Sequence, residues 1–94
     1  MKKLSASEIK VALATVPDWK KRGGTITRIF EFKDFPAAIK FVTAAAKLAE
    51  KAWHHPDIDI RWNKVTLTLT THDAGGLTNR DFSLAKQLNQ KARG

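Results

Sequence analysis

The spacing of apolar residues along the chain changes between helical and strand periods. Near the N-terminus, the Ser5-Ala6-Ser7-Glu8 spacing predicts a capping box, in which the serine hydroxyl and the glutamate side chain satisfy free backbone amides. A short apolar stripe of Ile9, Leu13 and Val16 follows, and Pro17 disfavours further helix. We therefore expect a first helix that ends before Pro17.

Two β-type segments, 19–22 and 25–32, follow on either side of Gly23-Gly24. Glycines supply the positive φ that a tight turn requires, so the pattern predicts a hairpin. Period-two spacing places Ile26, Phe30 and Phe32 on one face of its second strand.

Asp34 and Pro36 predict the start of a second helix, with Asp34 as N-cap and the proline in the first turn. Small and apolar residues then recur at steps of three and four, which predicts a stripe that packs on a sheet. The stripe consists of Phe35, Ala38, Ile39, Val42, Ala45, Ala46 and Ala49.

Period-two alternation returns after residue 56 and predicts a second hairpin with its tight connection at Asn63-Lys64. Trp62 is then expected to be a core residue of the first strand, and residue 56 pairs near residue 71. In the second strand, Val65, Leu67 and Leu69 alternate with threonines, which predicts one buried face.

A third capping spacing, Thr78-Asn79-Arg80-Asp81, predicts a closing helix. Its buried side comprises Leu77, Leu84, Ala85 and Leu88. The order is then α-β-β-α-β-β-α. We predict one domain over residues 1–94, an α+β fold of two layers with a four-stranded antiparallel sheet and three helices on one face.

Composition narrows the possible functions. The 94 residues contain no cysteine, which excludes disulfides, thiol nucleophiles and cysteine-based zinc sites and fits a reducing cytoplasm. No apolar run reaches the roughly 18 residues of a transmembrane helix. The formal net charge of +8 comes from basic residues spread along the chain, and no nucleic-acid-binding motif accompanies them. A solvated basic surface is therefore favoured over a nucleic-acid-binding face.

The three histidines, His54, His55 and His72, each lie where a predicted element meets a loop. The predicted register of the second hairpin brings His72 back beside the His54-His55 pair. Imidazole titrates near neutral pH, so neighbouring rings can donate and accept protons in one cycle. Glu50, four residues before His54, and Asp81 are the acids that would fix a tautomer or hold a charged ring.

Other interpretations remain open for these residues. Asp81 would also serve simply as the capping partner of Thr78, and isolated histidines are often structural. Three histidines also make a zinc centre chemically possible, but no further residue has a familiar metal-ligand spacing, so we predict no metal.

Several of these residues together resemble a known family. The segment Glu50-Lys51-Ala52-Trp53-His54-His55-Pro56, followed by Trp62, His72 and Asp81, is similar to the signature of the pterin-4a-carbinolamine dehydratases. The resemblance extends from about Trp19 to Leu88 and requires separated positions to match at fixed spacing.

The resemblance implies an enzyme that removes water from 4a-hydroxytetrahydropterin to give quinonoid dihydropterin, without a cofactor, in pterin recycling. It implies His54 and His72 as general acid and base, with His55 holding the substrate. Residues Pro56, Thr71, Asp73 and Ala74 would line the pterin pocket, and Glu50 and Asp81 would support the histidines.

The resemblance also implies an α+β fold and a homodimer or homotetramer. An alternative function is a protein-binding module, because some members of the family are partners of transcription factors. The alanine-rich helix at 35–49 offers such a packing surface.

Overall fold

A computed structural model of the chain describes residues 2–94, so Met1 of the predicted domain lies outside the described residues. The elements in chain order are α1 (Ala6–Ala14), β1 (Lys20–Arg22), β2 (Thr25–Glu31), α2 (Phe35–Ala52), β3 (Asp57–Arg61), β4 (Lys64–Leu69), the short 3₁₀ helix η1 (His72–Ala74) and α3 (Asn79–Arg93).

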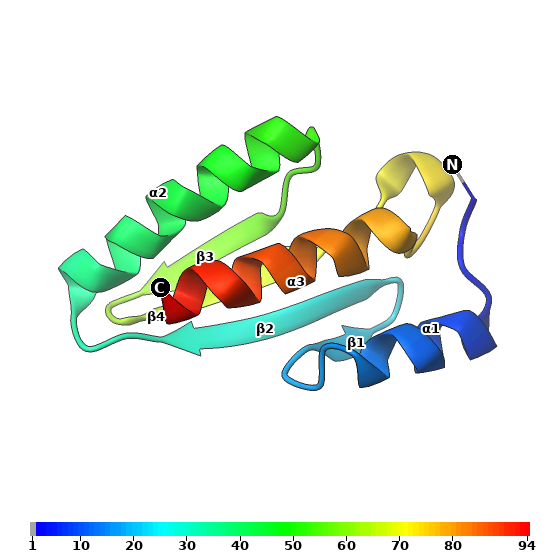
Figure 1. Cartoon of the computed structure of the whole chain (residues 1–94), viewed down its shortest axis with the longest axis horizontal. Helices are drawn as coiled ribbons and strands as arrows, with labels where there is room; N and C mark the ends of the chain where they lie inside the picture. Colours follow the sequence, from blue (N-terminus) through cyan, green and yellow to red (C-terminus); the bar gives the residue numbers. More distant parts are fainter. Residues whose placement is uncertain (1) are drawn as a thin grey trace.

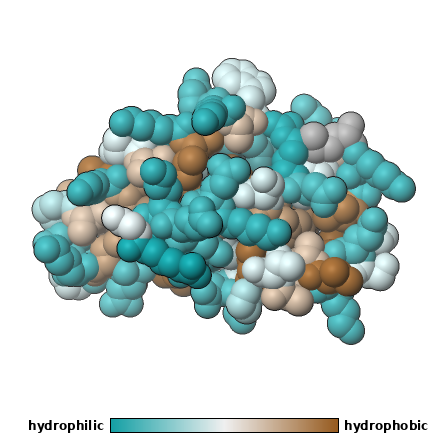
Figure 2. All heavy atoms as spheres, in the orientation of Figure 1, coloured by the Kyte–Doolittle hydropathy of each residue, from teal (hydrophilic) through white to brown (hydrophobic). Residues whose placement is uncertain are grey.

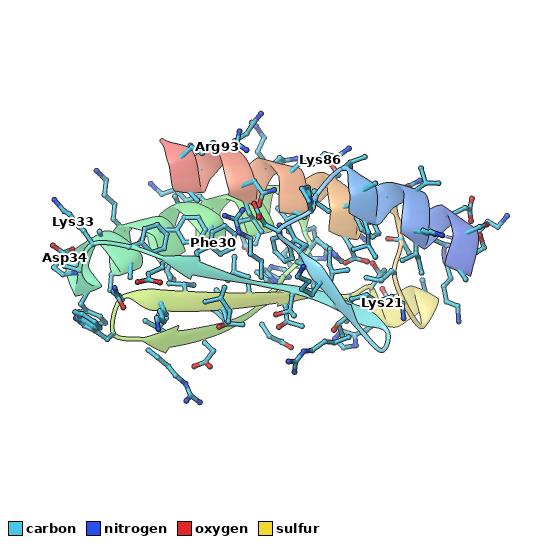
Figure 3. All side chains as sticks on the ribbon, turned by 90° about the horizontal axis from the view of Figure 1, so that it is seen from below. Lys21, Phe30, Lys33, Asp34, Lys86 and Arg93 are labelled. Carbon is cyan, nitrogen blue, oxygen red and sulfur yellow. The ribbon has the colours of Figure 1, made fainter. Side chains whose placement is uncertain are left out.

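The four strands form one antiparallel sheet in the order β1-β2-β4-β3. The helices lie on one side of this sheet, and its other side is open (Figures 1 and 3). The predicted α+β class and element order are confirmed. No helix in residues 2–94 is long and apolar enough to cross a membrane.

The core lies between the sheet and the helices. Phe30 points from β2 toward the helical layer (Figure 3), where its ring meets Trp19 edge-on at 5.9 Å and Phe41 of α2 at 4.8 Å. From the sheet, Val65, Leu67 and Leu69 are buried, as their alternation predicts. On the face shown in Figure 2, hydrophilic residues cover most of the surface and apolar ones form small separate groups.

The predicted helix starts are confirmed. Ser5 and Glu8 form a capping box at α1. Asp34 accepts a hydrogen bond from the amide of Ala37 at the start of α2. Thr78 and Asp81 form a second capping box at α3.

The buried side of α2 is rotated relative to the predicted stripe. Its buried residues are Ala38, Phe41, Ala45 and Ala49. Phe35 and Ile39 are exposed, whereas Phe41, absent from the predicted stripe, packs between Phe30 and Phe32. The helix meets both the sheet and α3, and this double contact selects a different side from the one that the small residues suggest.

The prediction for the second hairpin is wrong in its turn. Trp62 has a positive φ of 54° and occupies the turn with Asn63, while Lys64 already belongs to β4. Its side chain is 69% exposed, so Trp62 is not a core residue. The turn lies one residue earlier than predicted, so Asp57 pairs with Thr68 and the expected pairing of residue 56 near 71 is also wrong.

Candidate active site at the junction of α2 and α3

The end of α2 determines where the paired histidines lie. Trp53 adopts a left-handed conformation, φ 50° and ψ 47°, directly after the last helical residue. This ends the helical spacing, so Glu50 and His54 are not neighbours on one helix face. Instead, Glu50 lies 2.9 Å from His55, measured from Oε1 to Nε2.

His54 turns inward and meets α3. His54 is only 8% exposed, and its Nε2 is 2.5 Å from Oδ1 of Asp81, which is fully buried. When the carboxylate of Asp81 is ionised, it only accepts hydrogen bonds, and Nε2 of His54 is then the donor in this pair. Nδ1 is then the nitrogen of His54 that is able to gain or lose a proton.

The second oxygen of Asp81 connects the pair to the loop after β4. Oδ2 accepts hydrogen bonds from the hydroxyl of Thr71 and from the backbone amide of Thr78, both at 2.9 Å. The two threonine hydroxyls are also 2.9 Å apart. The capping interpretation of Asp81 is therefore correct, and the same carboxylate also fixes the ring of His54.

His55 has a different environment. Its ring and the side chain of Glu50 are both more than half exposed, so their contact is a surface interaction that contributes little to stability. His54 is thus a buried, oriented imidazole and His55 an accessible one, in adjacent positions of the chain.

The remaining predicted pocket residues lie in two loops. Pro56 is half-buried and leads from His55 into β3. Thr71 is buried, and its backbone pairs with that of Gly76, which closes a tight loop around η1. Within η1, His72 and Asp73 are exposed and Ala74 is half-buried.

His72 is linked to the pair through its neighbour. Thr71 bonds to Asp81, and Asp81 bonds to His54, so one hydrogen-bonded chain leads from the residue before His72 to His54. In the part of the chain that the structure describes, the side chain of His72 forms no hydrogen bond or ion pair of its own. Its ring is therefore not held by another side chain.

Arg80 belongs to this junction but was not singled out by the sequence. Its Nη2 donates to the backbone oxygens of Ala52 and Trp53, at 3.1 and 2.5 Å. These carbonyls lie at the negative end of the α2 dipole, which favours a cation there. The partners are backbone groups 27 and 28 residues away, so no side-chain pattern announces the contact.

A shallow cavity of about 270 Å³ opens beside this junction. His54 lines it together with Ala52 from α2 and Asn79, Arg80, Ser83 and Gln87 from α3. Neither His55 nor His72 is among its lining residues. Across residues 2–94, no group of three or more histidine, cysteine or acidic side chains is arranged to hold a metal ion. The chemistry that the junction offers is proton transfer by imidazole.

Comparisons with known proteins identify relatives of the whole chain. The sequence pattern of the family described as "Pterin 4 alpha carbinolamine dehydratase" matches residues 2–91. A protein of Chloroflexus aurantiacus, whose name assigns it provisionally to the pterin-4-alpha-carbinolamine dehydratases, is 57% identical over 90 residues. The match covers 96% of this chain and 97% of the relative. A similarly named protein of Roseiflexus sp. is 54% identical over 94% of this chain and 95% of its own.

Two solved structures have related folds. One, described as a transcriptional coactivator/pterin dehydratase from Brucella melitensis, superposes with a TM-score of 0.93 and 40% identity over 97% of this chain and 99% of its own. The other is a pterin dehydratase-like protein identified as a RuBisCO assembly factor in the alpha-carboxysome. It has a TM-score of 0.65 and 21% identity, covers 79% of this chain and 86% of its own, and shows a shared fold only.

Proposed function

Because the chain belongs to the pterin 4 alpha carbinolamine dehydratase family, we propose that it catalyses the loss of water from 4a-hydroxytetrahydropterin to give quinonoid dihydropterin. In this reaction the bond between carbon 4a and the hydroxyl oxygen breaks, and the adjacent ring nitrogen loses its proton as the C=N bond forms. The hydroxyl leaves as water after taking up a proton, so one proton is delivered and one removed. No oxidant or reductant is needed.

Imidazole groups suit both proton transfers. Hydroxide is a poor leaving group and must be protonated as it departs, while the ring nitrogen requires a base. We assign these roles to His54 and His72 and the holding of the substrate to His55, as the family resemblance implies. Pro56, Thr71, Asp73 and Ala74 remain our candidates for the pocket wall.

The observation that most supports the proposal is the contact between Asp81 and His54. A buried carboxylate that orients a histidine, and leaves its other nitrogen without a partner among the described residues, is a common arrangement for a general acid or base. A histidine that served only to fill the core would not need an ionisable partner at hydrogen-bond distance.

The test is a spectrophotometric assay of carbinolamine breakdown, run with and without a chelator. His54→Ala and His72→Ala are each expected to lower the rate by about 10²–10⁴, the usual contribution of a positioned acid or base. Circular dichroism and Lys64→Ala, a variant of an exposed β4 residue, control for folding. Turnover of the double variant at the wild-type rate would refute the assignment, and a rate that falls with chelator would indicate a metal.

We also propose that the chain forms a homodimer or homotetramer. β3 is an edge strand, and its Ile58 and Ile60 are partly exposed, as are Phe35 and Ile39 of α2. Exposed strand edges with apolar side chains favour pairing with another chain. Light scattering after size-exclusion chromatography should give a multiple of 10.5 kDa. Ile58→Lys should shift that mass toward the monomer, and a monomeric wild-type protein would contradict the proposal.

The same surface supports the second candidate function, a protein-binding module. The Brucella melitensis structure is described as a transcriptional coactivator as well as a pterin dehydratase. A partner captured by this chain, together with an absence of dehydration activity, would favour this function over the enzyme.

A further inference from the structure

The backbone of Trp53 is held in place from two directions. Its amide donates to the carbonyls of Ala49 and Glu50 at the end of α2. Its own carbonyl accepts from Arg80 of α3. A positive φ is rare for a bulky residue and persists only where surrounding contacts impose it. These hydrogen bonds impose it here.

The indole of Trp53 gains little from this position within the chain. It is 71% exposed, so its burial does not stabilise the fold. Among residues 2–94, its aromatic neighbour is His55, whose ring it meets edge-on with centroids 5.1 Å apart and planes at 80°. A large aromatic ring thus lies on the surface, beside the accessible histidine, without an evident structural role.

The cavity beside His54 is small for a complete ligand. Its volume of about 270 Å³ falls below the roughly 300–1,000 Å³ of typical small-molecule sites. A bicyclic substrate that reaches His54 therefore also covers neighbouring surface. Ala52 and His54 line the cavity, and each is followed in the chain by a residue with an exposed ring, Trp53 after Ala52 and His55 after His54.

We propose that Trp53 is a substrate-binding residue whose indole stacks against the flat ring of the pterin, while His55 contacts the polar edge of that ring. This inference rests on the proposed function and adds a determinant of substrate affinity to it. Stacking of a planar heterocycle on an aromatic side chain tolerates different substituents on the heterocycle, because it uses the π-face of the ring. By the usual effect of removing such a ring, we expect an affinity loss of roughly tenfold.

Trp62 provides a matched control within the same chain. It is also an exposed tryptophan, at 69%, with a positive φ of 54°. It lies in the turn beyond β3, so the five residues of that strand, about 17 Å at 3.3 Å each, separate it from the histidine pair. The same substitution at Trp53 and Trp62 therefore tests whether position beside the histidine pair matters for pterin binding, because residue type, exposure and backbone conformation are alike at the two positions.

The experiment measures dihydropterin binding by calorimetric titration with 7,8-dihydrobiopterin, and KM and kcat in the dehydration assay. Trp53→Ala should raise Kd and KM roughly tenfold and leave kcat within about twofold, because the indole transfers no proton. Trp53→Phe should recover most of the affinity, since a smaller ring still stacks. Trp62→Ala and Trp62→Phe should behave as wild type.

Three results would overturn the inference while the dehydratase proposal stands. One is a Trp53→Ala protein that binds dihydropterin as tightly as wild type. Another is an equal loss in the Trp53 and Trp62 variants. A third is a fall in kcat with unchanged Kd, which would indicate that the indole only positions His55. If the wild-type protein neither binds nor turns over pterins, the proposed function itself fails. Trp53→Phe remains informative if Trp53→Ala does not fold, because phenylalanine keeps an aromatic ring at this position.

Discussion

Removal of the Asp81 carboxylate should separate the structural and chemical roles of the α2–α3 junction. In Asp81→Ala, the ring Nε2–H of His54 and the backbone amide of Thr78 both lose their acceptor in a buried region. The hydroxyl of Thr71 keeps the oxygen of Thr78 as an alternative partner. Each unsatisfied buried donor costs about 1–3 kcal/mol, so the two together should lower the free energy of unfolding by about 2–6 kcal/mol.

That loss is large for a domain of this size, whose total stability is usually about 5–15 kcal/mol. Urea denaturation followed by circular dichroism measures it directly. Asp59→Ala is the matched control, because Asp59 is an exposed acid whose contact with Arg61 lies on the surface. Such surface pairs contribute about 0–1 kcal/mol. An Asp81→Ala protein as stable as this control would refute the structural part of the reasoning.

Asp81→Asn tests the chemical part. The amide keeps one oxygen for the donors of Thr71 and Thr78, so the expected destabilisation is only about 1–2 kcal/mol. Its NH₂ group then faces Nε2 of His54, which must become an acceptor, and neutral His54 then carries its hydrogen on Nδ1. ¹⁵N chemical shifts of the imidazole report this change of tautomer. We expect the dehydration rate to fall by about 10²–10⁴, and an unchanged tautomer with full activity would show that Asp81 does not orient the ring.

Two further predictions concern the fold. Phe30→Ala should destabilise the protein by about 3–5 kcal/mol, because the ring is buried and contacts those of Trp19 and Phe41; a loss below 1 kcal/mol in urea denaturation would contradict this. The hydrogen bond from the amide of Ser5 lowers the pKa of Glu8. The stability that this bond gives to α1 is therefore complete above the unfolded-state pKa and is lost as pH falls through the lower folded-state pKa. The amide proton shift of Ser5 should titrate with a midpoint below 4.5, the ordinary value for glutamate, and a midpoint at or above it would refute the capping contact.

The features that sequence predicted well are those that depend on neighbours in the chain. The capping boxes at Ser5 and Thr78 each need residues only three positions apart, and both occur as predicted. The hairpin at Gly23-Gly24 is also confirmed, because Gly23 has the positive φ of 56° that the turn requires.

The second hairpin shows why other features were not predictable. Its turn places a positive φ on Trp62, a residue with no preference for that conformation, so no glycine marks the position. Asn63 is instead fixed by tertiary contacts, since its side-chain amide donates to the carbonyl of Phe32, and Phe32 donates to the carbonyl of Asn63. A contact across 31 residues decides the turn, and local preference does not reveal it.

For the candidate site, the sequence could propose the residues but not how they pair. Glu50 and Asp81 were both expected to serve the histidines, but which acid meets which ring depends on the left-handed conformation of Trp53. That conformation is held by the amide bonds of Trp53 to the end of α2 and by Arg80, whose partners are backbone oxygens. Sequence spacing therefore proposed which titratable residues form the site, whereas their pairing depends on the packing of α3 against α2.

One carboxylate connects the beginning of a helix to a candidate acid–base group. Oδ2 of Asp81 belongs to the capping box of α3, and Oδ1 belongs to His54. Because both oxygens are fixed by these partners, α3 cannot shift at its first turn without moving the imidazole. Arg80, the residue before Asp81, holds the end of α2 through two carbonyls, so the same turn of α3 also positions the backbone that carries the histidine pair. Stability and site geometry are thus coupled at this one turn, and we expect variants that loosen the start of α3 to lose activity before they lose the fold.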